Sequence, residues 1–142
     1  MNSNWERMAV ELTRLGYRPE AFRVPSERGG GDGVWFEYSI KDGSRVGETV
    51  ALALAVHDQQ EGKWPEVAPH WVYLSPPDPV LAEQVRGARP RGVVENYECE
   101  DGRAWMAISA PPSDFWDQID TADGKTMKTY LDRHIRRIWK AR

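Results

Sequence analysis

Cys99 is the residue of this sequence best suited to nucleophilic chemistry. It is the chain's one cysteine, and a thiol is a good nucleophile even without a neighbouring base. Asp101-Gly102 follows it closely and is a strong signal for a hairpin turn, which would leave the thiol within reach of a substrate. Arg103 then lies close enough in sequence to favour the thiolate. On this interpretation Cys99 is a catalytic residue.

The same hairpin also supports a purely structural cysteine. A two-residue turn at this place pairs Cys99 with Ala104 and Tyr97 with Met106. These side chains give a mostly apolar strand face, which raises the pKa of a thiol and hides it. Free cysteines often serve as small buried hydrophobic residues. The sequence leaves both interpretations of Cys99 open.

Other patterns for catalysis, metal binding or cofactor binding are incomplete. Gly124-Lys125-Thr126 ends like a phosphate-binding loop, but Ile119 occupies the position where that motif needs its earlier glycine. The glycines between 29 and 33 lack the spacing of a dinucleotide-binding loop, and no strand pattern precedes them. One cysteine and three scattered histidines give no metal-ligand spacing. We expect no metal site and no cofactor.

Two of the histidines have different predicted roles. His134 lies on the apolar stripe of a predicted helix, where a histidine is usually packed and hydrogen-bonded. His70 begins a predicted strand beside Trp71, and strand ends often carry functional residues. We therefore expect a structural role for His134 and regard His70 as the better functional candidate.

Composition places the chain among ordinary folded proteins. It has 142 residues, of which 40% are hydrophobic and 29% charged, enough to build one core, and we predict one domain spanning residues 1–142. A net charge of −3 gives no overall attraction to nucleic acid or anionic membranes. The longest apolar run, residues 50–56, is too short to cross a bilayer, and the N-terminus has no signal-peptide pattern. With a single cysteine, these features predict a cytoplasmic protein.

Charged residues are unevenly distributed near the C-terminus. Residues 93–123 hold eight acids and one base, whereas residues 124–142 hold seven bases and one acid. The simplest interpretation is a solvated acidic stretch beside a helix whose cations complement its dipole. Two alternatives are a docking surface for a partner of opposite charge and a basic helix that contacts nucleic acid.

Helical patterns stand at both ends of the chain. The first predicted helix begins with Asn4 as its N-cap and ends at Gly16, with an apolar stripe of Trp5, Met8, Leu12 and Leu15. The last spans about residues 125–139 and has a stripe of Met127, Tyr130, Leu131, Ile135 and Ile138. A short helical turn is also expected at residues 80–85.

Strand patterns occupy the middle of the chain. Residues 34–40 alternate, residues 49–56 are apolar on both faces, and residues 71–74 end at a proline-rich segment. Residues 93–99 and 104–109 flank the hairpin turn. Residues 28–33, rich in glycine, are expected to form a flexible turn. The predicted fold is α+β: an N-terminal helix, an antiparallel β-meander and a C-terminal helix packed on it.

This order of elements resembles the E2-like fold of ubiquitin-conjugating enzymes. The resemblance rests on Tyr73 followed by Pro76-Pro77 after the third strand, on Trp116, and on the last helix. The stretch from residue 105 to 139 looks most like divergent bacterial E2-like families found with ubiquitin-like proteins. The resemblance implies a two-layer E2-like arrangement, with a ubiquitin-like protein and an E1-like activating protein as partners.

The resemblance also implies site residues. Cys99 would carry the modifier as a thioester, and the binding residues would be Trp71, Tyr73, Pro76, Pro77 and Trp116. The chain departs from ubiquitin-conjugating enzymes in three features, one of which is the lack of their usual asparagine-bearing motif before the cysteine. Their catalytic cysteine lies about eight residues before the tryptophan, where this chain has Ile108, and their tyrosine-to-proline spacing is one residue longer. We therefore expect either a conjugating protein whose catalytic cysteine has moved to Cys99, or a catalytically inactive protein-binding module.

Overall fold

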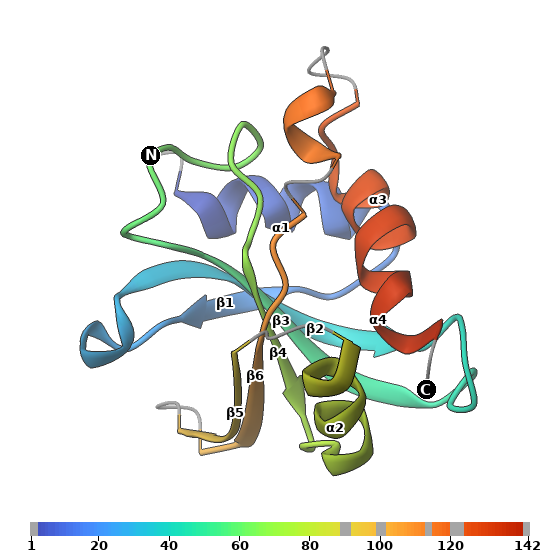
Figure 1. Ribbon diagram of the computed structural model, residues 1–142. Coiled ribbons are helices and arrows are strands. Elements are labelled where there is room, and N and C mark those ends of the chain that lie inside the picture. The colour runs from blue at the N-terminus through green and yellow to red at the C-terminus, as the bar shows by residue number, and fades with distance from the viewer. Residues whose placement is uncertain (1–2, 89–91, 99–101, 113–114, 120–123, 141–142) are drawn as a thin grey trace.

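The computed structural model describes residues 3–88, 92–98, 102–112, 115–119 and 124–140. The fold is α+β, as predicted, with helices at both ends of the chain and a six-stranded antiparallel sheet between them (Figure 1). The helices are α1 (Asn4–Arg14), α2 (Pro79–Ala88), α3 (Met127–Tyr130), η3 (Leu131–Ile135) and α4 (Arg136–Lys140), with two short 3-10 helices, η1 (Ser26–Arg28) and η2 (Trp116–Gln118). The strands are β1 (Glu20–Arg23), β2 (Gly31–Ser39), β3 (Thr49–His57), β4 (Trp71–Ser75), β5 (Val93–Glu98) and β6 (Ala104–Ser109).

The strand order is β1-β2-β3-β4-β6-β5, so the predicted meander holds for the first four strands only. After β4 the chain enters α2 and then forms β5 at the outer edge of the sheet. β6 returns between β5 and β4 and pairs with both. No helix in the described part of the chain combines the length and the apolar character needed to cross a bilayer.

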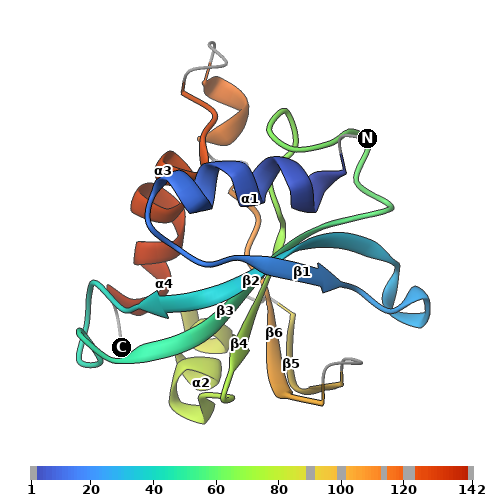
Figure 2. The ribbon, with the colours of Figure 1, turned by 180° about the vertical axis from the view of Figure 1, so that it is seen from behind.

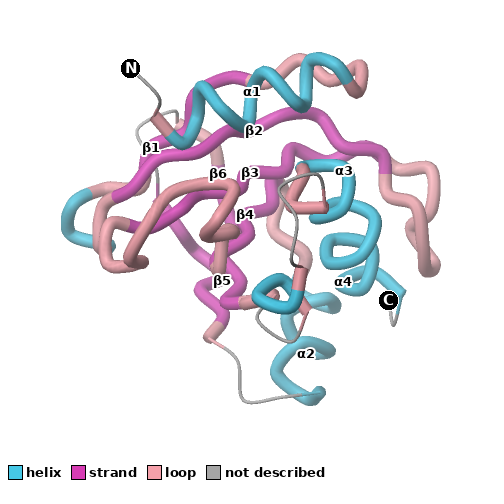
Figure 3. The backbone as a smooth tube through the Cα atoms, turned by 90° about the horizontal axis from the view of Figure 1, so that it is seen from above, coloured by secondary structure: helices cyan, strands magenta, loops and turns pink. Residues whose placement is uncertain are grey.

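β3 is buried on both faces of the sheet, as its apolar pattern predicts. Val50, Leu52, Leu54 and Val56 of β3 join the core on the first face, which α1 and the α3–α4 helix cover. In Figure 3, α1 runs along β2. Ala51, Ala53 and Ala55 point to the second face, where they meet a layer of aromatic side chains: Phe22, Tyr73, Tyr97 and Trp105.

The N-cap of α1 is Ser3 and not Asn4, which corrects the sequence prediction. Ser3 Oγ accepts a hydrogen bond from the Glu6 amide, and the Glu6 carboxylate accepts one from the Ser3 amide, which together form a capping box. Asn4 instead turns inward. Its Oδ1 accepts from the amide of Trp64 and its Nδ2 donates to Asp32. Asparagine is suited both to capping a helix and to bridging buried groups, so the sequence pattern could not distinguish the two roles of Asn4.

The glycine-rich segment is not only a turn, and the expectation that no strand precedes it is wrong. β1 lies before it, and Gly31 and Gly33 belong to β2. A Cβ at Gly33 would lie only 1.8 Å from the carbonyl oxygen of Leu54, so close approach of the neighbouring backbone explains that glycine. The sequence pattern does not predict β1, because the strand has only four residues and one buried side chain, Phe22.

The predicted register between β5 and β6 is wrong by one residue at Tyr97 and by two residues at Val93 and Val94. Tyr97 pairs with Trp105 and Glu98 with Ala104, and a register shift separates Val94 from Tyr97. A β-bulge of this kind moves side chains to the other face of a strand. Tyr97 therefore shares the second face with Trp105, whereas Met106 belongs to the core of the first face.

The remaining helices agree with the sequence. α2 contains the predicted turn at residues 80–85 and is longer than expected. The last helix begins at Met127, two residues after the predicted start, and its η3 section is a π-helical turn. Its buried side chains include Met127, Tyr130, Leu131 and Ile135, so four of the five predicted stripe residues lie in the core and Ile138 is half-buried.

Candidate functional site

The segment that leads from β4 into α2, residues 75–80, carries two of the predicted binding residues at the surface. We call it the β4–α2 segment. Pro76 is exposed and Pro77 is half-buried. Pro79 is exposed, and Val80 is 50% exposed. Because proline lacks an amide hydrogen, β4 ends at Ser75, and Pro79 takes the first position of α2, where no hydrogen bond is lost.

Asp78 fixes this segment to the body of the protein. Its side chain is buried, and one oxygen accepts a 3.0 Å hydrogen bond from the Leu81 amide, which caps α2. The other oxygen accepts a 2.8 Å bond from Arg45 in the β2–β3 turn, which also pairs with Glu48. Burial by itself lowers the pKa of Arg45, but the bonds to Asp78 and Glu48 raise it overall. Arg45 therefore stays charged, and its bond to Asp78 holds the segment in place.

The predicted binding residues of β4 point elsewhere, to the second face of the sheet. Tyr73 is fully buried, and its ring lies 4.9 Å from that of Phe22. Trp71 is half-buried and stacks on His57 at 5.9 Å. Alternation along β4 separates these two side chains from Val72 and Leu74, which face the opposite core. Tyr73 contributes to packing and is not available to a partner in this conformation.

His57 is a buried polar residue that the sequence pattern did not single out. Its Nε2 lies 2.5 Å from the hydroxyl of Tyr73, and its Nδ1 is buried without a hydrogen-bond partner. Burial lowers the pKa of His57, opposed by the negative charge of Asp58. The signal was present in the alternation of β3, which puts His57 on the same face as its three alanines.

Trp116 belongs to the first face and is also buried. Its indole donates a 3.0 Å hydrogen bond to the carbonyl of Pro65 and lies 5.3 Å from the ring of Trp64. The structure therefore separates Trp116 from Trp71 and Tyr73 by the thickness of the sheet. A cavity of about 220 Å³ lies beside it, and half-buried His70 lines that cavity. Burial lowers the pKa of His70, opposed by the charge of Asp117.

His134 is packed and hydrogen-bonded, as predicted. Arg137 is always a donor, so its 2.9 Å contact makes Nδ1 of His134 the acceptor. The proton then sits on Nε2, which donates to the carbonyl of Ala110 at 2.5 Å. Both ring nitrogens are used within the protein.

The basic C-terminal run contacts the protein itself. Arg136 forms an ion pair with Asp42, and Lys128 forms one with Asp132. Arg133 and Arg137 lie over the ring of Phe115 at 4.4 and 5.5 Å. These contacts favour the interpretation that the basic residues are paired within the protein and do not form a docking surface.

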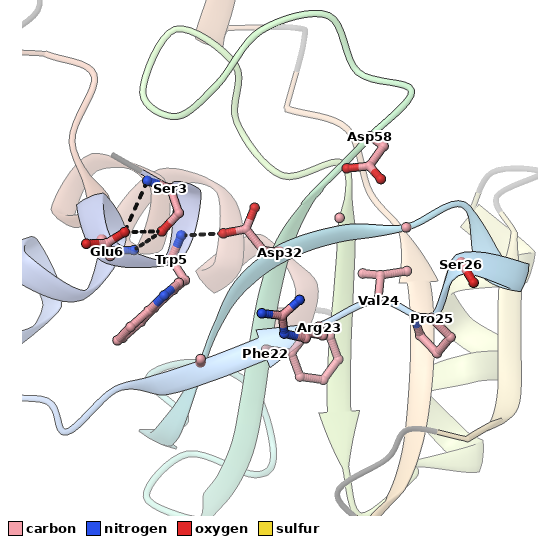
Figure 4. A pocket seen from close by; sticks show the side chains of 13 residues that line it. Ser3, Trp5, Glu6, Phe22, Arg23, Val24, Pro25, Ser26, Asp32 and Asp58 are labelled. Carbon is pink, nitrogen blue, oxygen red and sulfur yellow. Dashed lines mark hydrogen bonds between the residues drawn. The ribbon is translucent and has the colours of Figure 1, made fainter. Parts of the chain in front are cut away.

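A groove of about 660 Å³ lies between the start of α1 and the β1–β2 ribbon (Figure 4). Asp32 stands at its centre, but both of its oxygens are engaged by Asn4 and by the amide of Trp5. Arg23 and Asp58 are exposed at its walls. Asp32 thus anchors α1 to the sheet. The groove lies where the helix and the β1–β2 ribbon meet, and we assign it no binding role.

Cys99 lies outside the described residues and comes directly after the last residue of β5. Within the described residues, no three histidine, cysteine or acidic side chains gather as a metal site. Comparison of the chain with models of protein families, with curated proteins and with solved structures finds no match.

Proposed function

We propose that this chain is an E2-like protein-binding module that docks a protein partner through the β4–α2 segment. The observation that carries the proposal is the exposure of Pro76, Pro79 and Val80 on a segment held by the ion pair between half-buried Arg45 and buried Asp78. A rigid apolar surface loses little conformational entropy on binding, and its burial drives association.

The order of elements supports an E2-like interpretation. A first helix precedes four antiparallel strands in sequence order, and Trp116 comes before the last helix. The proline-rich exit follows the fourth strand, β4, and not the third as the resemblance implies. The partner class that goes with this interpretation is a ubiquitin-like protein or its E1-like activating protein.

Burial at the usual nucleophile position favours the inactive module. Ile108, eight residues before Trp116, is fully buried in the first core, and neither its side chain nor the hydroxyl of the following Ser109 forms the thioester of a conjugating enzyme.

The test is a binding assay with purified bacterial ubiquitin-like proteins and their E1-like activating proteins. Val80→Glu adds a charge to the proposed surface and should weaken binding at least tenfold, because the carboxylate must be desolvated. Val10→Glu is the matched control, since Val10 is 52% exposed on α1 and lies outside the segment. Equal affinity of the two variants would refute this surface, and absence of binding to the whole panel would refute the partner class.

Thioester transfer at Cys99 is the second candidate, favoured by the position of the chain's one cysteine directly after β5. The Cys99 thiolate would attack the carbonyl of a modifier thioester on the activating protein and release that protein's thiol. An acceptor amine would then attack the new thioester, form an amide and release the Cys99 thiol.

Cys99→Ser separates the two candidates. After incubation with ATP, an activating protein and a modifier, a transferase shows a band that reducing agent removes. With Cys99→Ser that band should be lost while affinity for the partner is kept. A wild-type chain that binds but forms no reducible adduct leaves the inactive module as the function.

A further inference from the structure

The turn between β1 and β2 reaches across the second face of the sheet. We call residues 25–30 the hairpin tip; in Figure 2 it is the loop at the right-hand end of β1. Arg28 of the tip lies over the ring of Tyr97 at 5.0 Å, and Phe22 of β1 lies 5.3 Å from Trp105. β1 and β5 are the two edge strands of the sheet and are not paired. Side chains alone therefore close this seam.

The hairpin tip is a self-contained turn with few bonds to its surroundings. The amides of Arg28 and Gly30 donate to the carbonyl of Pro25, and the amide of Gly29 donates to that of Ser26. Among the described residues, one backbone hydrogen bond links the tip to the residue after β3. The amide of Asp58 donates it to the carbonyl of Gly30 at 3.2 Å. The tip can therefore lift as a unit when that bond and the Arg28 contact break.

His57 lies beneath the hairpin tip. A Cβ at Gly29 would lie 3.5 Å from Nδ1 of His57, which shows how closely the tip backbone approaches the imidazole. His57 is only 5% exposed, and its Nδ1 has no hydrogen-bond partner. Nδ1 of an imidazolium is a donor, and a buried donor without an acceptor is costly. Water can supply an acceptor only if the cover opens.

We propose that the hairpin tip is an acid-sensitive cover, which opens when His57 is protonated and closes when His57 is neutral. Opening exposes Nδ1 to water and loosens the aromatic seam between Phe22, Tyr97 and Trp105. Two observations support this proposal: Nδ1 of His57 is buried without a hydrogen-bond partner, and few bonds hold the tip to the rest of the protein.

The charged and titratable groups around His57 set the direction of the effect. Tyr73 of β4 bonds Nε2, Asp58 at the end of β3 favours the imidazolium, and His70 opposes it. The tip itself carries Glu27 and Arg28. Burial outweighs Asp58, so the pKa of His57 in the closed form is lower than its ordinary value.

A lowered pKa means that the closed form binds fewer protons than the open form. Closure is therefore fully favoured above the ordinary histidine pKa of about 6.5 and weakens as the pH falls below it. One titrating group changes the ratio of open to closed forms by at most about tenfold per pH unit.

Amide hydrogen exchange of Asp58, whose bond to the carbonyl of Gly30 breaks when the tip lifts, measures this ratio directly. Protection factors, corrected for the intrinsic pH dependence of exchange, should stay constant from pH 7.5 to 6.5 and fall up to about tenfold by pH 5.5. His70→Gln should keep this fall, whereas His57→Gln should remove it. A flat wild-type profile, or an equal fall in His57→Gln, would overturn the proposal.

Asp58→Asn provides a test that does not alter the buried site. Asp58 is exposed, and its charge favours protonated His57. Without it the pKa of His57 in the closed form drops further, so protection should continue to fall at pH values where the wild type has levelled off. An unchanged profile in this variant also contradicts the mechanism, even if His57→Gln does not fold.

Discussion

The carboxylate of Glu11 accepts a 2.6 Å hydrogen bond from the indole of Trp64. Its other oxygen accepts a 2.8 Å bond from the amide of Met127, the first residue of α3. One side chain on α1 therefore joins the loop before β4 and the start of the last helix. These contacts connect residues that are 53 and 116 positions apart in the sequence.

We expect Glu11→Ala to lower the free energy of unfolding by about 2 kcal/mol, because two charge-assisted hydrogen bonds are lost and the donors are left in a partly buried site. Urea denaturation measures this change. Glu37→Ala removes the same charge from an exposed strand position and should change stability by less than about 0.5 kcal/mol. Similar losses in both variants would show that Glu11 contributes only its charge.

Gly33→Ala should be among the most damaging small substitutions, with a loss on the order of 3–5 kcal/mol. The new Cβ would meet backbone atoms of Leu54 and Ala55, at 1.8 and 2.6 Å, and backbone cannot move aside cheaply. Gly47→Ala is the control: its φ is +91°, but no atom lies within 4 Å of the new Cβ, so a loss of about 1 kcal/mol is expected. Thermal unfolding of both variants checks the order.

Side-chain periodicity predicted the long elements of this fold and missed the short ones. β3 and the last helix were found because each places several large apolar residues on one face over nine or more residues. β1 was missed because its single buried residue, Phe22, has its partners Tyr73 and Trp105 far along the chain. No local pattern carries that information.

The candidate site, like the fold, could be predicted from the sequence only in part. Exposed prolines after β4 could be read from the sequence, since proline ends a strand and is rarely buried. The partner that fixes them could not, because Arg45 and Asp78 meet only after β2, β3 and β4 have paired. The predicted set also mixed two environments, since Tyr73 and Trp116 are buried on opposite faces.

Ala53→Leu should destabilise the protein by about 1–3 kcal/mol, because a larger side chain must displace the aromatic layer of the second face. Ala53 is fully buried, and the small side chains of β3 leave the space that Tyr73 and Trp105 fill. Ala21→Leu, at an exposed position of β1, should be nearly neutral. If chemical denaturation gives Ala53→Leu the stability of the wild type, the second face holds unfilled space.

Alkaline pH should unfold the protein through two buried tyrosines. Burial raises the pKa of Tyr38 and of Tyr130 above the ordinary value of about 10. The folded state therefore holds protons that the unfolded state releases, so this contribution to stability is complete below pH 10 and is lost above it. Each of these two groups should lower the free energy of unfolding by up to about 1.4 kcal/mol per pH unit.

The two tyrosines differ in a way that phenylalanine variants can resolve. The hydroxyl of Tyr130 donates to the carbonyl of Pro69 at 2.8 Å, whereas the hydroxyl of Tyr38 is buried without a hydrogen-bond partner. Tyr130→Phe should lose about 1 kcal/mol at pH 7, and Tyr38→Phe should lose little or gain stability. Each variant should reduce the slope of stability against pH above 10 by up to about 1.4 kcal/mol per pH unit, as followed by urea denaturation. An unchanged slope in either variant would mean that its tyrosine reaches solvent before the protein unfolds.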